Sequence, residues 1–89
     1  MSLRIVVTDC YFVDNKVIPQ GTVESGVLKP GMLLLIQELN IKGTMLQFEM
    51  MQGGMNEAVV GDITAFSLTN ISGNLTRDMV KPGFVITQA

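Results

Sequence analysis

The 89-residue sequence contains no histidine and a single cysteine, Cys10. Without histidine, neither a Ser-His-Asp triad nor a Cys-His pair can be built from this chain. One cysteine and no histidine also leave too few ligands for a zinc site. A lone cysteine cannot form an internal disulfide, which fits a reduced, cytoplasmic setting. We therefore interpret Cys10 as a small apolar residue of a strand rather than as a reactive thiol.

Longer sequence features are missing as well. The pattern Gly-x-x-x-x-Gly-Lys-Ser/Thr, which forms a nucleotide-binding loop, does not occur. No apolar run approaches the roughly 20 residues of a membrane-spanning helix, and there is no signal-peptide pattern. Six basic and eight acidic side chains give a net charge of −2, which argues against binding nucleic acid by charge alone. A shape-specific contact made together with other domains is still compatible with this charge.

The residues that are present predict one small domain with a core. Hydrophobic residues make up 47% of the sequence and charged residues 16%, which is typical of a folded rather than a disordered chain. Lys29-Pro30-Gly31 and Lys81-Pro82-Gly83 each precede a short apolar stretch. In both, proline presets φ at about −65° and glycine supplies the positive φ that a type II turn requires. We interpret them as one turn used twice, not as a true sequence repeat.

Segments rich in β-branched and aromatic residues lie between the turn signals, and no segment sustains a helical period. The predicted strands are Leu3–Val13, Val17–Glu24, Met32–Ile36, Thr44–Met50, Ile63–Thr69 and Phe84–Thr87. Pro19 indicates an edge, a bulge or a strand start within the second segment. Many short strands with regular turns predict an all-β protein, and closure into a barrel would remove the exposed strand edges.

Alternation predicts which side chains face the core. The buried face of the fourth segment is expected to carry Leu46, Phe48 and Met50. Its other face is expected to carry Met45, Gln47 and Glu49. On the fifth segment, one face is expected to carry Thr64, Phe66 and Leu68. Met32–Ile36 is apolar throughout, which predicts burial on both faces, and Glu38–Gly43 is predicted to be a loop.

Candidate functional residues are few. The carboxylates are scattered, and no spacing pairs two of them for acid–base catalysis. Four methionines gather within one stretch of the sequence, Met45, Met50, Met51 and Met55. Core filling is the simpler explanation; an adaptable contact surface is the alternative, for which Met51 and Met55 are the best candidates. Gly53-Gly54, which lies between them, is interpreted as a loop or bulge because no helix start follows it.

Several short motifs, in order and spacing, resemble the second domain of translational GTPases. The most specific is the string Ile18–Met32, IPQGTVESGVLKPGM. The other matching motifs are Leu3-Arg4-Ile5 followed by Asp9 and Tyr11, Phe48-Glu49-Met50, Glu57-Ala58 with Gly61-Asp62 and Phe66, and Asn70-Ile71-Ser72. Together they cover nearly the whole chain. The sequence is most similar to eukaryotic elongation factor one-alpha and to the related release-factor and ribosome-rescue GTPases.

The resemblance implies a six-stranded antiparallel closed β-barrel taken from a longer translational GTPase. It implies a non-catalytic binding module, with GTP and magnesium held by the GTPase domain of the parent protein. The implied partners are tRNA or a tRNA-mimicking protein, the small ribosomal subunit, a nucleotide-exchange factor and the adjacent domains. In the elongation factors, the first strand of this domain helps to hold the terminal adenosine and aminoacyl ester of tRNA. The matching positions here are Thr8, Asp9 and Tyr11.

Tyr11 admits two interpretations. Its ring could stack on a base, or it could be a barrel aromatic whose hydroxyl lies at the rim. The sequence also departs from the family pattern at three places. A glycine-rich turn is shorter here and reads Asp14-Asn15-Lys16, Thr22 replaces an arginine, and Met51-Gln52 replaces a histidine pair. These differences fit a divergent paralogue, such as a release or rescue GTPase, or an unusual elongation factor. A stand-alone β-barrel that assembles through its methionine-rich surface is the alternative, and an independent enzyme is the least supported hypothesis.

We predict that the 89 residues alone neither bind nor hydrolyse GTP, because they contain no nucleotide-binding loop. Calorimetric titration with GTP and magnesium should give only heats of dilution. A tight, saturable site would contradict the interpretation of this chain as a non-catalytic module.

Overall fold

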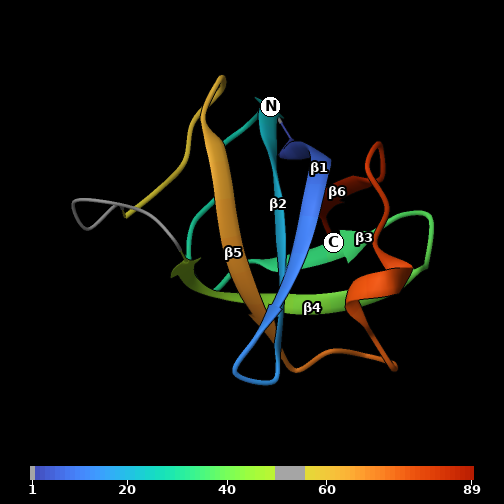
Figure 1. The fold of residues 1–89 in the computed structure, drawn as a ribbon. Helices are drawn as coiled ribbons and strands as arrows, with labels where there is room; N and C mark the ends of the chain where they lie inside the picture. Colours follow the sequence, from blue (N-terminus) through green and yellow to red (C-terminus); the bar gives the residue numbers. More distant parts are fainter. Residues whose placement is uncertain (1, 50–55) are drawn as a thin grey trace.

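Figure 1 shows the computed structural model of the chain, which describes residues 2–49 and 56–89. The strands are β1 (Arg4–Val13), β2 (Lys16–Ser25), β3 (Leu33–Ile36), β4 (Ile41–Glu49), β5 (Ile63–Thr69) and β6 (Val85–Gln88). They close into an antiparallel barrel in the order β1-β2-β5-β4-β3-β6. Within the described ranges the one helix is a 3-10 turn, η1 (Arg77–Met79). The predicted all-β fold, six antiparallel strands in a closed ring, is confirmed.

Three glycine turns of the same geometry connect the strands, namely the two Lys-Pro-Gly turns and the turn at Gly61. Their glycines adopt the expected positive φ, at Gly31 (91°), Gly61 (95°) and Gly83 (93°). Each glycine N–H donates to the carbonyl oxygen of a buried strand residue, which is Met45 (2.8 Å), Val23 (2.9 Å) and Val7 (2.8 Å) respectively. The N–H groups of Met45, Val23 and Val7 in turn donate to the carbonyl oxygen of the residue after each glycine, which is Met32, Asp62 and Phe84 respectively. The third turn, residues 59–62, has neither lysine nor proline. Its sequence therefore does not indicate that it shares the geometry of the two Lys-Pro-Gly turns.

A β-bulge in β4 overturns the predicted inward face of that strand at Met45 and Leu46. The pairing with β5 shifts register between Met45 and Gln47, which inserts Leu46 as an extra residue, so the alternation before the bulge is the reverse of the one predicted and the alternation after it is not. Met45 is therefore only 1% exposed and Leu46 is 46% exposed, the opposite of the prediction. Phe48 packs half-buried against the core and Gln47 is exposed, as expected. Glu49 is half-buried, and Met50 lies outside the described residues.

Two further expectations about β3 and β4 were wrong. Leu33 is 45% exposed and Leu35 is half-buried, whereas Leu34 and Ile36 are buried, because alternate residues of β3 face out of the barrel. The expected loop before β4 ends earlier than predicted, since Ile41 already pairs with Ile36 of β3. Asn40 has a positive φ, which allows the tight turn that pairs β4 with β3 directly after Asn40.

The core fills the inside of the barrel with side chains from every strand. Its largest fully buried side chains include Phe66, Leu3, Ile5, Leu28, Leu34, Ile36, Met45 and Ile86. The predicted buried face of β5 is confirmed, with Thr64 at 1%, Phe66 at 0% and Leu68 at 6% exposure.

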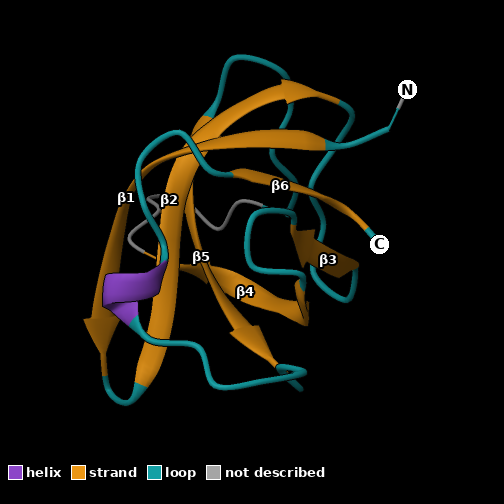
Figure 2. Cartoon of the chain, turned by 90° about the vertical axis from the view of Figure 1, so that its right-hand side faces the viewer, coloured by secondary structure: helices purple, strands orange, loops and turns teal. Residues whose placement is uncertain are grey.

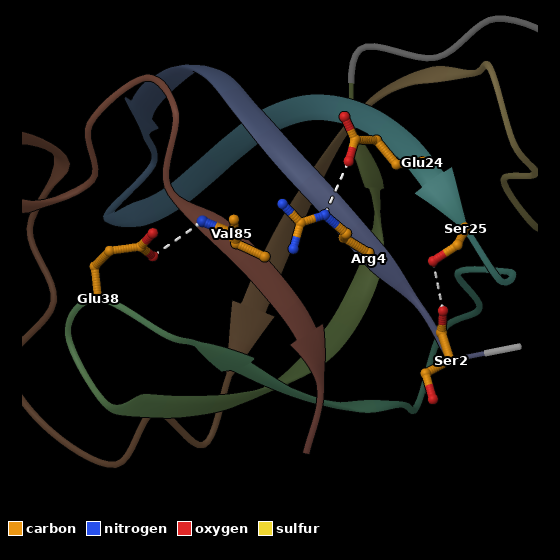
Figure 3. Close-up of polar contacts among 6 residues, drawn as sticks. All are labelled: Ser2, Arg4, Glu24, Ser25, Glu38 and Val85. Atoms are coloured by element: carbon orange, nitrogen blue, oxygen red, sulfur yellow. Dashed lines mark hydrogen bonds and ion pairs between the residues drawn. The ribbon is translucent and has the colours of Figure 1, made fainter.

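Polar contacts fasten the start of β1 and the start of β6 to their neighbours (Figure 3). Ser25 Oγ donates to the Ser2 carbonyl oxygen at 2.7 Å, and Arg4 Nε donates to Glu24 at 2.9 Å. The Val85 N–H donates to the carboxylate of Glu38 at 2.9 Å.

Gly21 lies where β2 passes close to β1. A Cβ atom there would overlap the carbonyl oxygen of Val6 and lie 2.8 Å from Ile5 Cγ2. Gly21→Ala should therefore lower the free energy of unfolding by about 1–3 kcal/mol, the usual cost of overpacking. The matched control is Gly73→Ala, whose Cβ would meet Ile41 at 3.8 Å, an ordinary contact. Chemical denaturation of both variants tests this; equal stabilities would contradict the close approach.

Candidate functional site

A bulge at Thr8 divides β1 into two parts. The pairing with β2 shifts register between Val7 and Asp9, so Thr8 has no partner in the ladder. Its exposed hydroxyl donates to the carbonyl oxygen of Gln20 at 3.3 Å. Beyond the bulge, Asp9 and Tyr11 are two residues apart on the strand and project to the same side. The structure therefore brings Asp9 and Tyr11 together and turns Thr8 towards β2.

The carboxylate of Asp9 organises the outer face of this strand. One oxygen accepts the Tyr11 hydroxyl at 3.2 Å, and the other accepts the Cys10 N–H at 2.8 Å. The hydrogen bond to Asp9 raises the pKa of Tyr11 above its ordinary value, because only the protonated phenol can donate it. The half-buried Tyr11 ring is thus held at a fixed place, with its hydroxyl at the surface.

An open groove of about 420 Å³ lies beside Asp9 and Tyr11. Its opposite wall comes from η1 and the turn before β6, and includes Arg77, Asp78, Lys81 and Pro82. We name this the Tyr11 groove. It contains aromatic, anionic and cationic groups within one depression, which suits a ligand that combines a ring with a charge.

Sequence reasoning missed Arg77 and Lys81 as site residues. They lie more than 60 residues from Tyr11 in the chain and reach it because β6 pairs with Arg4–Val6 of β1. The Gly83 N–H continues this pairing by donating to Val7, so the segment before β6 runs on along β1. The Lys81-Pro82-Gly83 turn was the only sequence signal, and it indicated backbone geometry rather than a site.

Cys10 lies on the inward side of β1 and is buried. Burial, and secondly the charge of Asp9, raises the pKa of its thiol to about 11. At neutral pH the group is therefore a thiol and not a thiolate, which agrees with its interpretation as an apolar strand residue.

The other predicted positions lie away from the Tyr11 groove or cannot be placed. Met51 and Met55 lie outside the described residues. Asp14 and Asn15 form a two-residue hairpin turn with φ of 52° and 61°, and Lys16 after them pairs with Glu49 at 3.3 Å.

Among residues 2–49 and 56–89, no group of three or more His, Cys, Asp or Glu side chains could hold a metal ion. η1 has three residues, and no helix described here is long and apolar enough to cross a membrane.

Comparison with solved structures finds the same barrel inside much longer proteins, although no protein-family model matches the sequence. A bacterial selenocysteine-specific elongation factor, EF-Sec, aligns with 98% of this chain at a TM-score of 0.84 and 22% identity. The elongation factor SelB from Methanococcus maripaludis aligns with 99% at 0.83 and 15% identity. GDP-bound aIF5B from Aeropyrum pernix aligns with 98% at 0.72 and 15% identity.

The chain has the fold of a translation-factor β-barrel domain. It spans 14% of the EF-Sec chain, 19% of the SelB chain and 14% of the aIF5B chain. These likenesses support the general resemblance to translational GTPases, and they do not single out elongation factor one-alpha.

Titration of Tyr11 tests the geometry of the site. Tyr11 is the only tyrosine and the chain has no tryptophan, so the ultraviolet absorbance of tyrosinate reports this residue alone. In the wild-type protein its pKa should lie above the ordinary value of about 10. Asp9→Ala removes the acceptor and the opposing charge, so it should lower the pKa of Tyr11 towards that value. Glu24→Gln, which removes a distant charge, is the control, and equal pKa values in Asp9→Ala and wild type would contradict the hydrogen bond.

Proposed function

We propose that this chain is a non-catalytic binding module of a translational GTPase. In this proposal it contacts tRNA, or a protein that mimics tRNA, together with the small ribosomal subunit. GTP and magnesium are bound by a separate domain of a cytoplasmic parent protein, and a nucleotide-exchange factor is a further candidate partner. The observation that carries the proposal is the alignment of 98% of this chain with one barrel of a selenocysteine-specific elongation factor.

The Tyr11 groove supports the binding part of the proposal. Tyr11 offers an aromatic face on which a base or a planar side chain can stack, and such stacking tolerates any base. Arg77 and Lys81 on the opposite wall offer positive charge to a phosphate or carboxylate. The Asp9 carboxylate, already engaged by two donors, keeps the tyrosine in position.

The charge of the chain limits what the domain does by itself. A net charge of −2 gives little general attraction for a polyanion. Affinity for a whole tRNA should therefore come largely from other domains, while this barrel contributes a local contact.

A stand-alone assembly module is the second candidate. Exposed apolar side chains at the turn before β5 favour it, since Val60 is 61% and Ile63 is 63% exposed. Such a patch is typical of a surface that meets another protein.

The proposal is tested with Tyr11→Ala in the full-length parent protein. Loss of one stacking face should weaken binding of charged tRNA or of the protein partner roughly 5- to 150-fold, the range expected for one base–aromatic contact. The control is Leu33→Ala, an exposed position on β3. Thermal unfolding of both variants must match wild type before the comparison is made. If the folded Tyr11→Ala protein binds tRNA and partner as tightly as wild type, the Tyr11 groove is not the binding site.

A further inference from the structure

We propose that an apolar patch at one end of the barrel docks an amphipathic helix of a separate partner protein, and that a basic residue of this helix pairs with Asp62. The patch, which we name the Val60 patch, consists of Val27, Val59, Val60 and Ile63. The inference goes beyond the proposed function, because the patch shares no residue with the Tyr11 groove. It also names the partner that the second candidate function leaves open.

The Val60 patch lies where residues 22–28 and residues 58–63 run antiparallel and pair at both ends. Figure 1 shows the turn that leads into β5 at the end of the barrel away from the β1–β2 hairpin. The 3-10 turn η1, which forms a wall of the Tyr11 groove, packs against β1 near that hairpin (Figure 2). The barrel therefore has two separate surfaces, and each can contact a different partner.

The four side chains of the patch face solvent and have no role in the core. Val60 and Ile63 are 61% and 63% exposed, and Val27 and Val59 are 36% and 44% exposed. None of them belongs to the hydrophobic core or packs against it. All four are β-branched, so their χ1 angles are restricted and they lose little conformational entropy when a partner covers them. The patch is therefore a preformed contact surface.

Val60 lies where the other two glycine turns have proline. It directly precedes Gly61, as Pro30 precedes Gly31 and Pro82 precedes Gly83. Proline is favoured at this position because its φ is preset, whereas valine contributes nothing comparable to the turn. An exposed valine here is explained by contact with another molecule better than by the fold of the barrel.

The backbone beside the patch determines the kind of partner. The N–H of Val23 donates to the carbonyl oxygen of Asp62 at 3.0 Å, and its carbonyl oxygen accepts the Gly61 N–H at 2.9 Å. Leu28 and Ala58 exchange both of their backbone hydrogen bonds at 2.9 Å. An added strand would find these groups already engaged, whereas a helix satisfies its own backbone and presents only side chains. The patch therefore fits one face of an amphipathic helix.

The charges around the patch determine the sign of the partner. Glu24 pairs with Arg4 at 2.9 Å, and Glu57 pairs with Lys29 at 3.8 Å. Asp62 has no ion-pair partner among residues 2–49 and 56–89, and one of its oxygens accepts a backbone N–H of the turn at 2.9 Å. Three carboxylates and two cations border the patch, so a phosphate backbone would be repelled. A lysine or arginine beside Asp62 complements this border.

The size of the patch argues against a stable dimer of this chain. Four side chains with these exposures present a few hundred Å² of apolar surface. A stable interface buries roughly 800 Å² on each partner. The expected contact is therefore a weak and reversible one with a single helix.

The inference is tested by titrating the ¹⁵N-labelled 89-residue chain with two synthetic helical peptides of equal length. Both have leucine at positions i, i+3, i+4 and i+7, and the flanks of this apolar face are lysine in one peptide and glutamate in the other. We expect chemical-shift changes at the amides of the Val60 patch. The lysine peptide should bind at least about fivefold more tightly, because an attractive charge pair replaces a repulsive one.

Variants of the patch identify the residues responsible. Val60→Ser and Ile63→Ser should each weaken the lysine peptide roughly 5- to 50-fold, since each removes an apolar side chain from the contact. Asp62→Asn keeps an oxygen for the turn N–H but removes the charge, so it should reduce the preference for the lysine peptide. The matched control is Leu33→Ser, an exposed leucine on β3. Only variants whose thermal unfolding matches wild type are compared, and two patch variants are made in case one does not fold.

Four outcomes would overturn the inference. They are equal affinities for the two peptides, shift changes confined to other surfaces, unchanged binding in a folded patch variant, and a concentration-dependent dimer in sedimentation that Ile63→Ser abolishes. Loss of lysine-peptide binding in the full-length parent protein would do the same, because a neighbouring domain would then cover the patch. None of these measurements involves tRNA or Tyr11→Ala, so the proposed function stands or fails separately.

Discussion

Closure of the barrel depends on three pairs of hydrogen bonds between glycine turns and buried strand residues. The strand residues are Val7, Val23 and Met45, each 1% exposed. The carbonyl oxygen of each accepts the N–H of a turn glycine, and its N–H donates to the carbonyl oxygen of the residue after that glycine. Each of the three residues pairs with a neighbouring strand on one side, and these bonds satisfy its backbone N–H and C=O groups on the other side. Beside β6 they lengthen a short pairing, since β6 pairs with β1 over three residues. The hydrogen bonds of Val7 with Gly83 and Phe84 extend the β1–β6 pairing and fix the path of the chain that precedes Gly83.

The candidate site is a consequence of this extended β1–β6 pairing. The segment that approaches the Gly83 turn contains η1, and its path alongside β1 places Arg77 in the same groove as Tyr11. At the same level the bulge at Thr8 interrupts the β1–β2 ladder, after which Asp9 and Tyr11 face the approaching segment. The bulge at Thr8 and the Gly83 turn therefore determine which residues line the groove, and neither of the two lies in the core.

The strands could be predicted from the sequence because turn chemistry and alternation are local properties, and both Lys-Pro-Gly turns formed as expected. The errors share a physical cause. The bulge at Leu46 depends on how β4 meets β5, and the exposure of Leu33 depends on what covers β3; neither is encoded within one strand. Likewise, Asp9 and Tyr11 could be named from the first strand and a family resemblance. Arg77 could not, because only the ring order of the strands brings it to β1.

The pairing of the first strand with the last has a consequence for the order of events during synthesis. While the ribosome extends the chain, β1 and β2 can form their hairpin early, but the other edge of β1 has no partner until β6 has left the exit tunnel. An unpaired edge can associate with another chain during that interval. We therefore expect the Arg4–Val6 edge of the nascent barrel to be open to misassembly until the final strand arrives.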